Sequence, residues 1–221
     1  MTGRVPGAGG ASGRPVRIGI TGPIGCGKSQ VSIWLGELGV AVVDADAVAH
    51  RVTAPGQPAH DAVVRRFGDA VTAPDGTLDR AALGRLVFAD PAALRDLEGI
   101  VHPAVRPVIF EAIDAAERDG APAVALEAIK LVEGGLAALC DEVWLVTCDA
   151  AVQRQRLAWR GTAAADAERR IAAQAGLTDR LRPAATLVLD TSGTAPATRT
   201  MVAAALAKAV ARARQRVITR P

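Results

Sequence analysis

The sequence predicts an α/β fold in which five parallel strands form one sheet with helices on both faces. Five short runs are apolar at successive positions, as in strands buried on both faces, and they occupy residues 16–20, 40–43, 123–126, 143–146 and 187–189. Helical patterns alternate with these runs. A glycine-rich loop directly follows the first run and precedes a helical pattern, the usual place of a phosphate-binding loop in such sheets.

The helical patterns follow in chain order. Residues 28–38 join the first two strands, residues 150–159 and 163–175 follow the fourth strand, and residues 195–217 close the chain. The mostly helical stretch at 47–118 is too long for a simple crossover, so it predicts a helical subdomain beside the sheet. In the last helix, Met201, Val202, Leu206 and Val210 recur at helical spacing, which predicts one packed apolar face with arginines outside.

Length and composition fit one large domain. The chain has 221 residues, of which 50% are hydrophobic, and this apolar content excludes a disordered polypeptide. Three cysteines are too few for a disulfide scaffold, and no run of about 18 apolar residues suggests a membrane span. We expect residues 1–14 to be a flexible tail and 15–221 to be a single domain. Unpaired cysteines and the lack of a signal-peptide core predict a cytoplasmic location.

Charge is unevenly distributed along the chain. There are 23 arginines but only three lysines, Lys28, Lys130 and Lys208, and there is no asparagine. The formal net charge is +3, whereas residues 154–182 carry +4 and residues 198–221 carry +6. The basic C-terminal segment has little aromatic interleaving, so nucleic-acid binding is not expected. A lysine retained in so lysine-poor a chain indicates a position where arginine substitutes poorly.

The loop after the first strand is the strongest motif. Residues 22–29 read Gly-Pro-Ile-Gly-Cys-Gly-Lys-Ser and fit the pattern G-x-x-x-x-G-K-[ST] of nucleotide-binding P-loops. Glycines let backbone N–H groups converge on phosphate oxygens, Lys28 can reach the β- and γ-phosphates, and Ser29 offers a hydroxyl to Mg²⁺. Cys26 is expected to be a small spacer, although the adjacent helix N-terminus could lower its thiol pKa, which leaves a redox role as an alternative. The predicted nucleotide-binding residues are Gly22, Gly25, Cys26, Gly27, Lys28, Ser29 and Gln30.

Two large classes of P-loop protein are disfavoured. The guanine-reading motif of GTPases, Asn-Lys-x-Asp, needs an asparagine, and this chain has none. A Leu-Ser-Gly-Gly-Gln signature of ABC-type ATPases is also missing from the sequence. Small kinases and nucleotide-gated binding modules therefore remain.

The second strand ends in an acidic sequence, Asp44-Ala45-Asp46. Strand ends of this kind face the ligand crevice of a doubly wound sheet, where a carboxylate could accept a substrate proton or help to position Mg²⁺. A second interpretation is that Asp46 caps the following helix. If the strand continued, Asp44 and Asp46 would point to the same side.

These motifs, in this order, resemble the dephospho-coenzyme A kinase family. The resemblance covers nearly the whole chain after residue 14 and rests on Ile20-Thr21-Gly22, Asp44-Ala45-Asp46, Phe67-Gly68, Asp75-Gly76-Thr77-Leu78-Asp79-Arg80, Val87-Phe88, Leu97-Glu98, His102-Pro103-Ala104-Val105-Arg106, Arg156 with Arg160, and Arg170-Ile171 with Gln174. It implies the nucleoside monophosphate kinase fold, with a P-loop core of the NTP-hydrolase type. It also implies a reaction in which ATP phosphorylates the ribose 3′-hydroxyl of dephospho-coenzyme A, with Mg²⁺ as cofactor.

The resemblance assigns roles to named residues. Asp46 matches the proposed catalytic base and, with Ser29, a metal-positioning group; Lys28, Arg156 and Arg160 would act on the phosphates of ATP. The substrate-binding candidates are Asp46, Arg80, His102 and Arg106, although a structural role for His102 is equally open. Residues 47–118 match the substrate domain and residues 154–182 match an arginine-bearing lid.

Some positions depart from the family pattern. Pro23 and Cys26 interrupt the usual loop sequence, and Lys130 lies in the segment after the third strand, where many members have Pro-Leu-Leu-Phe-Glu. Thr191 stands where the family usually has an asparagine associated with adenine recognition, so the preferred base is open. A kinase of another small acceptor, such as a nucleoside monophosphate, and an inactive nucleotide-binding module remain alternatives. We expect a monomer or weak homo-oligomer that binds neither nucleic acid nor membrane.

Overall fold

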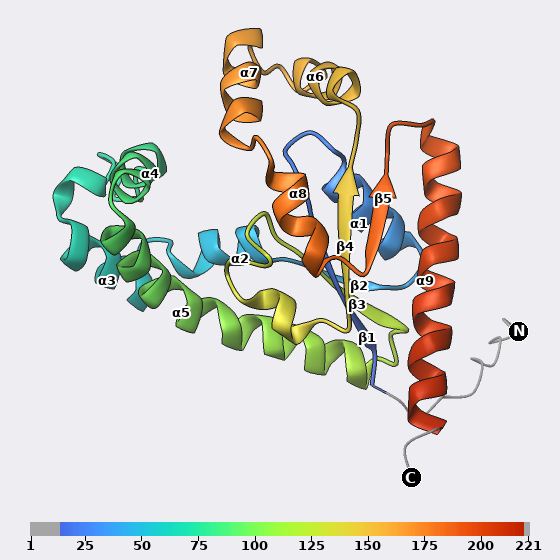
Figure 1. The fold of residues 1–221 in the computed structure, drawn as a ribbon. Coiled ribbons are helices and arrows are strands. Elements are labelled where there is room, and N and C mark those ends of the chain that lie inside the picture. The colour runs from blue at the N-terminus through green and yellow to red at the C-terminus, as the bar shows by residue number, and fades with distance from the viewer. Residues whose placement is uncertain (1–13, 219–221) are drawn as a thin grey trace, which may run out of the picture.

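Five parallel strands form one sheet in the computed structural model, which describes residues 14–218 (Figure 1). The strand order is β2-β3-β1-β4-β5, so the first strand lies in the middle and both of its neighbours come later in the chain. This confirms the predicted α/β fold class. The strands are β1 (Val16–Thr21), β2 (Ala41–Asp44), β3 (Ala123–Glu127), β4 (Glu142–Thr147) and β5 (Leu187–Asp190).

Helices cover both faces of this sheet. On one face, α1 (Lys28–Glu37) and α9 (Ala195–Ile218) pack against Ile18, Ile20 and Trp144 in a continuous apolar core. On the other face, α2 (Ala45–Val52) and the second half of α5 (Pro91–Arg118) pack against alternate residues of β3. Because both faces are buried, the strands lack an alternating polar pattern, as the apolar runs in the sequence indicate.

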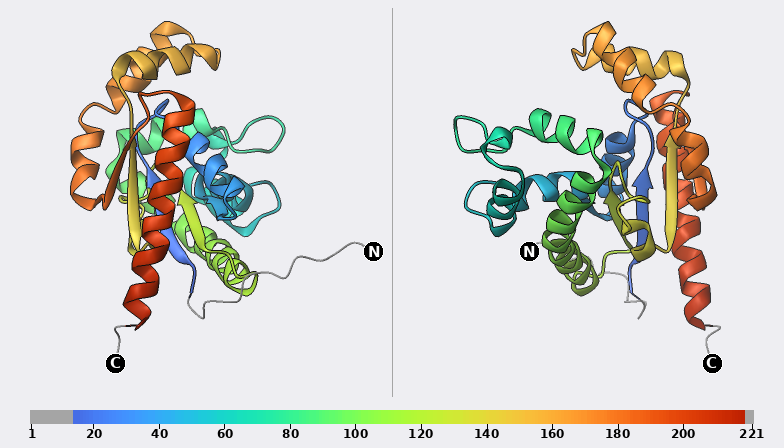
Figure 2. Two further views of the ribbon diagram at one scale, coloured as in Figure 1. Left: turned by 90° about the vertical axis from the view of Figure 1, so that its right-hand side faces the viewer. Right: turned by 60° about the vertical axis from the view of Figure 1, so that its left-hand side comes forward.

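The helical insert lies beside the sheet, on the opposite side of the molecule from α9 (Figure 2). It consists of α2, α3 (Pro58–Phe67), a short 3₁₀ turn at Asp69–Val71, α4 (Arg80–Ala89) and α5. A separate apolar cluster fills its interior, formed by Val63, Val71, Leu78, Leu83, Val87 and Ala93. Asp79 and Asp90 cap α4 and α5, since their carboxylates accept hydrogen bonds from the first backbone N–H groups of each helix.

Three helices lie between β4 and β5 in the chain, and the first two stand over the carboxyl edge of the sheet while the third lies alongside β4 (Figure 1). They are α6 (Ala150–Trp159), α7 (Ala164–Ala173) and α8 (Leu177–Leu181). The predicted helix at 163–175 ends where Gly176 adopts a left-handed conformation, with φ of 68°. The chain then starts α8, whose Leu177 and Leu181 pack on Leu145 of β4.

The last helix largely follows its predicted pattern. Val202 and Leu206 are buried against the sheet and Val210 packs beside them, but Met201 is 43% exposed, so its predicted place in the apolar face is wrong. No helix within residues 14–218 combines the length and apolar character needed to cross a membrane. The predicted flexible tail lies outside the described residues except for Arg14, whose guanidinium forms a 2.6 Å ion pair with Asp141.

Candidate active site

The P-loop connects β1 to α1 at the carboxyl edge of the sheet. Gly22 has φ of 141°, and a β-carbon there would lie 2.1 Å from the backbone oxygen of Val146, so only glycine allows the loop to approach β4 this closely. Gly27 has φ of 90°, and its β-carbon position lies 3.3 Å from Nη1 of Arg156. The loop therefore lies between the end of β4 and an arginine of α6.

Lys28 is buried in this loop, with 9% of its surface exposed. Its Nζ donates hydrogen bonds to the backbone oxygens of Gly22 at 2.8 Å and Pro23 at 3.1 Å. Burial lowers the pKa of Lys28, and the nearby charge of Arg160 acts in the same direction, whereas the carboxylates of Glu127 and Asp46 oppose the shift. These four charged groups thus share one site at the strand ends.

Glu127 is a site residue that the sequence reasoning missed. It ends β3, is 8% exposed, and its two carboxylate oxygens accept hydrogen bonds from the hydroxyls of Ser29 at 2.9 Å and Ser32 at 2.7 Å. Its signal in the sequence is a carboxylate that closes a buried apolar strand, the same signal that marked the end of the second strand.

Asp46 lies in the first turn of α2 and not in the strand, which ends at Asp44. The second interpretation, in which Asp46 caps the helix, is wrong, because the N-cap is Asp44, whose Oδ1 accepts from the backbone N–H of Ala47 at 2.9 Å. Oδ2 of Asp46 instead accepts from the backbone N–H of Ile129 at 3.2 Å. Desolvation raises the pKa of Asp46, the Ile129 hydrogen bond opposes this, and the charge of Asp44 adds to it.

The two arginines of α6 lie on the other side of the loop. Nη1 of Arg156 donates to Oγ1 of Thr191 at 2.8 Å, and its Nη2 donates to the backbone oxygen of the same residue at 2.7 Å. Arg160 is the C-cap residue of α6 and is exposed. Its charge is near enough to help lower the pKa of Lys28, so it lies within electrostatic reach of the phosphate-binding loop.

Two glutamines hold the backbone of the loop at Ile24. Nε2 of Gln153, on α6, donates to the backbone oxygen of Ile24 at 2.7 Å. Oε1 of Gln174, which caps the end of α7, accepts from the backbone N–H of Ile24, also at 2.7 Å. Both polar groups of one loop residue are therefore bonded to the helices above the sheet. Gln30, by contrast, is exposed on α1.

Cys26 is 2% exposed, in keeping with a small spacer in the loop. Its thiol pKa is lowered, as expected, but the largest cause is a hydrogen bond with the thiol of Cys148, and the charge of Lys28 contributes less. Burial opposes the shift. Cys148, in turn, has its pKa raised by the same contact and by desolvation.

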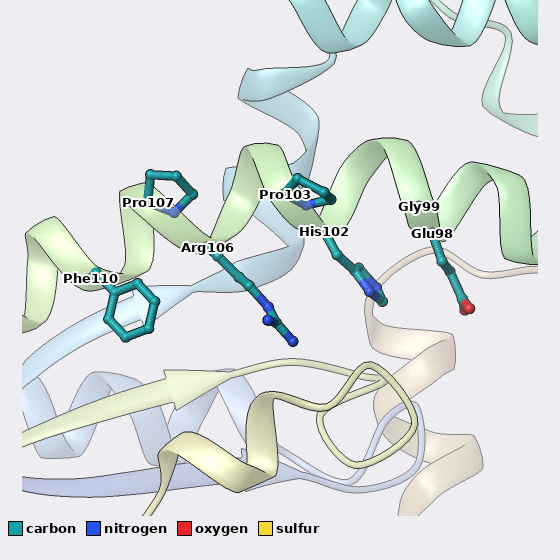
Figure 3. Close-up of a pocket in the computed structure, with 7 residues that line it drawn as sticks. All are labelled: Glu98, Gly99, His102, Pro103, Arg106, Pro107 and Phe110. Carbon is teal, nitrogen blue, oxygen red and sulfur yellow. The ribbon is translucent and has the colours of Figure 1, made fainter.

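A cavity of about 470 Å³ lies along α5, away from the P-loop residues. Its lining residues are Glu98, Gly99, His102, Pro103, Arg106, Pro107 and Phe110. Figure 3 shows that Glu98, His102 and Arg106 project from one side of the helix toward the segment that follows β3. The β-carbon positions of Gly134 and Gly135 in that segment lie 3.7 Å from Nε2 of His102 and 3.8 Å from Nη2 of Arg106.

Lys130 and Arg80 both contact residues of the helical insert. Nζ of Lys130 is 3.5 Å from Oε1 of Glu98 and 5.7 Å from the ring centre of Phe88, so it bridges the segment after β3 to α4 and α5. Arg80 does not line the cavity; its Nη2 donates to Oγ1 of Thr53 at 3.0 Å. The structure thus gathers the P-loop residues with Asp46, Arg156 and Arg160, places His102 and Arg106 together in the cavity along α5, and leaves Arg80 apart.

The oxygen donors beside Lys28 fit a magnesium ion. Within residues 14–218, no three His, Cys, Asp or Glu side chains come together as a protein-only metal site. Mg²⁺ in phosphoryl-transfer sites usually keeps several waters and takes one or two protein oxygens together with substrate phosphates. The hydroxyl of Ser29 and the carboxylate of Glu127, 2.9 Å apart, form such a donor set.

Comparison with known proteins gives a consistent family. A family model described as dephospho-CoA kinase matches residues 16–196. The dephospho-CoA kinase of Symbiobacterium thermophilum is 49% identical over 189 residues, 85% of this chain and 79% of that protein. That of Geobacter metallireducens is 43% identical over 188 residues, 85% and 93% of the two chains. The solved structure of TT1252 from Thermus thermophilus has a TM-score of 0.74 and 36% identity, covering 88% of this chain and 98% of that one. The chain belongs to the dephospho-CoA kinase family.

Proposed function

We propose that this protein transfers the γ-phosphoryl group of ATP to the ribose 3′-hydroxyl of dephospho-coenzyme A, giving coenzyme A and ADP. The observation that carries the proposal is the placement of two carboxylates beside the P-loop at the carboxyl edge of the sheet. Glu127, which ends β3, accepts from the hydroxyl of Ser29 at 2.9 Å, and Oδ2 of Asp46 accepts at 3.2 Å from the backbone N–H of Ile129, two residues after β3. Family membership supplies the substrate, and this site supplies the groups that phosphoryl transfer needs.

The residues of the loop would hold the nucleotide. Backbone N–H groups from Gly25 to Ser29 and the ammonium of Lys28 would contact the phosphates, while Ser29 and Glu127 would hold the metal ion. Bound Mg²⁺ supplies charge neutralisation on the phosphoryl oxygens. Arg156 and Arg160 face the loop from α6, where they would stabilise the charge that spreads over the transferring group.

Asp46 would act as the general base. The 3′-hydroxyl oxygen forms a bond to the γ-phosphorus, the bond to the bridging oxygen of ADP breaks, and the hydroxyl proton passes to the Asp46 carboxylate. A carboxylate whose pKa is raised by desolvation holds that proton more readily than one in water. The hydrogen bond from Ile129 fixes its orientation at the edge of the sheet.

The cavity along α5 would take the acidic part of the substrate. Arg106 and His102 project into it from one helix face, and a diphosphate group is matched by such donors. Lys130 stands beside Glu98 at the same cavity and would approach the substrate from the segment after β3. Arg80 would contribute indirectly, since its guanidinium joins the start of α4 to Thr53.

Residues 15–221 would work as one domain, in which the insert at 47–118 binds substrate and the segment at 154–182 closes as a lid. Closure over the phosphates would exclude water and limit ATP hydrolysis. We also infer a cytoplasmic protein, monomeric or weakly homo-oligomeric, without nucleic-acid partners; three free cysteines support the reducing location. Size-exclusion chromatography with light scattering measures the oligomeric state.

A coupled ADP-release assay tests the function. ATP and GTP are each combined with dephospho-coenzyme A and with nucleoside monophosphates, using wild type, Asp46→Asn and Lys28→Ala. We expect turnover with dephospho-coenzyme A and a loss of about 10²–10⁴-fold in kcat for Asp46→Asn. Turnover of a nucleoside monophosphate alone would assign a different kinase, and tight ATP binding without turnover of any acceptor would assign an inactive binding module.

A further inference from the structure

Thr191 joins three segments that meet at the P-loop. It directly follows β5 and is 3% exposed. Its Oγ1 lies 2.7 Å from the backbone oxygen of Cys26, 3.1 Å from that of Thr147 and 2.8 Å from Nη1 of Arg156. One hydroxyl thus contacts the loop, the end of β4 and an arginine of α6.

Every polar atom of Thr191 has a protein partner. Its backbone N–H donates to the oxygen of Thr147 at 2.9 Å, and its backbone oxygen accepts from Nη2 of Arg156 at 2.7 Å. A hydroxyl has one proton, so Oγ1 donates to either Cys26 or Thr147 while it accepts from Arg156. The guanidinium therefore binds Thr191 through two parallel N–H groups, one to the side chain and one to the backbone.

This two-point contact decides where the arginine lies. An arginine side chain has several rotatable bonds, and fixing it reduces its conformational entropy. The contact with Thr191 places Nη1 of Arg156 3.3 Å from the β-carbon position of Gly27, directly before Lys28 in the loop. Because the same hydroxyl contacts the backbone of Cys26, the guanidinium of Arg156 is held in a fixed position relative to the loop.

We propose that Thr191 is a positioning residue for Arg156, holding its guanidinium against the P-loop through the side-chain hydroxyl. The role of Arg156 rests on the proposed function, but the placement of its side chain does not. A corollary concerns the nucleotide base: since the hydroxyl is used within the protein, Thr191 does not read the base, and its removal should affect ATP and GTP alike.

A double-mutant cycle tests this role. The variants are Thr191→Val, which keeps the shape and removes the hydroxyl, Arg156→Ala, and the two combined. Thr191→Ser restores the hydroxyl. Thr198→Val is the matched control, because Thr198 is also 3% exposed and its hydroxyl donates only to the backbone oxygen of Thr194, directly before α9, at 3.0 Å. Each protein is measured for kcat and KM with ATP and GTP, for ATP binding by calorimetry, and for thermal midpoint.

We expect Thr191→Val to lower kcat/KM for ATP by about tenfold, the size of one hydrogen bond to a charged group. In the Arg156→Ala background the same change should have little further effect, Thr191→Ser should recover most of the activity, and Thr198→Val should not alter kcat/KM. The ratio of ATP to GTP turnover should be unchanged in Thr191→Val.

Two results would overturn the proposal. An equal loss from Thr191→Val with and without Arg156 would show that the hydroxyl acts on the loop alone. A changed preference between ATP and GTP would show that it reads the base. If wild type phosphorylates no acceptor, the proposed function fails. Calorimetric ATP binding by wild type, Thr191→Val, Arg156→Ala and the double variant still measures the coupling between Thr191 and Arg156.

Discussion

The carboxylate of Glu127 accepts a hydrogen bond from the hydroxyl of Ser29 at 2.9 Å, which ties the end of β3 to the first turn of α1. Its other oxygen accepts from Ser32 one turn later, at 2.7 Å. With 8% of its surface exposed, Glu127 is a buried carboxylate whose two partners come from α1, the helix that begins at the end of the P-loop. This arrangement places a negative charge beside the proposed metal-binding hydroxyl.

Replacing Glu127 with glutamine should impair the metal site more than the fold. Glu127→Gln keeps the volume but removes the negative charge, so we expect the magnesium concentration for half-maximal activity to rise and kcat to fall by roughly 100-fold. Magnesium titrations of the initial rate measure both. Ser32→Ala is the control, because it removes the second partner and leaves the contact with Ser29 intact; a similar loss in that variant would mean that Glu127 acts only as a structural group.

The hydrogen bonds of Gln153 and Gln174 to the backbone of Ile24 should hold the loop in its folded conformation before ATP binds. In Gln174→Leu the N–H of Ile24 loses its 2.7 Å partner, so we expect KM for ATP to rise about fivefold, as for the loss of one neutral hydrogen bond. Amide hydrogen exchange of residues 22–27 should become faster in the same variant. Unchanged exchange with a raised KM would place the effect in α7 and not in the loop.

Much of the fold and part of this site follow from the sequence. Strands without alternation and the P-loop spacing predict the sheet, the loop and Lys28, because burial on both faces and phosphate binding each impose a local pattern. Glu127 could have been predicted in the same way, because it is the carboxylate residue that closes a buried strand. The contacts of Gln174 with Ile24 and of Thr191 with Cys26 could not be predicted in this way, since each joins residues more than 100 positions apart. Such pairings are set by strand order, which no local pattern encodes.

The alternatives left open at Asp46 show a second limit. The sequence allowed a helix cap or a catalytic carboxylate at this position, and the structure gives the cap to the other aspartate of the motif. Asp44 caps α2, and this leaves the carboxylate of Asp46 to bond the backbone of Ile129. The choice between the two interpretations depends on whether α2 begins after Asp44 or after Asp46. Helix boundaries are the features that a sequence predicts least well.

Asp46→Asn should stabilise the protein while it removes activity. Desolvation raises the pKa of Asp46, so the folded protein holds this proton more tightly than the unfolded chain does. Ionisation of Asp46 therefore lowers the free energy of unfolding as the pH rises through the folded-state pKa. Because Asp46 is exposed and solvent screens its charge, we expect only a slightly higher thermal midpoint for Asp46→Asn at neutral pH, and equal midpoints below the ordinary carboxyl pKa, at about pH 3. A lower midpoint at neutral pH would contradict the desolvated site.

The basic C-terminal segment has a structural use in its described part. Arg199 forms a 2.8 Å ion pair with Glu37 of α1, and Arg212 forms a 2.6 Å ion pair with Glu142 at the start of β4. Both glutamates lie far from this segment in the sequence, so the local charge count of the segment does not include the acids that pair with its arginines. The two pairs join α9 to the elements that it packs against or covers.

Arg212 should contribute to stability and not to activity. Glu142 is 8% exposed and accepts from Arg212 through one oxygen and from Nε1 of Trp144 through the other, at the amino edge of the sheet opposite the P-loop. Arg212→Leu leaves this buried carboxylate half-paired, so we expect a loss of about 1–2 kcal/mol in the free energy of unfolding. Arg214→Leu, on the same helix and exposed, should change it by less than about 0.5 kcal/mol.

Urea denaturation of both variants, each in the wild-type and the Glu142→Gln background, separates the ion pair from the loss of a long side chain on α9. In the Glu142→Gln background the charge to be paired is gone, so Arg212→Leu should cost much less than it does in wild type. Equal losses in both backgrounds would assign the effect to the packing of the arginine stem. Values of kcat with ATP should match wild type throughout, because β4 separates Glu142 from the loop by its whole length.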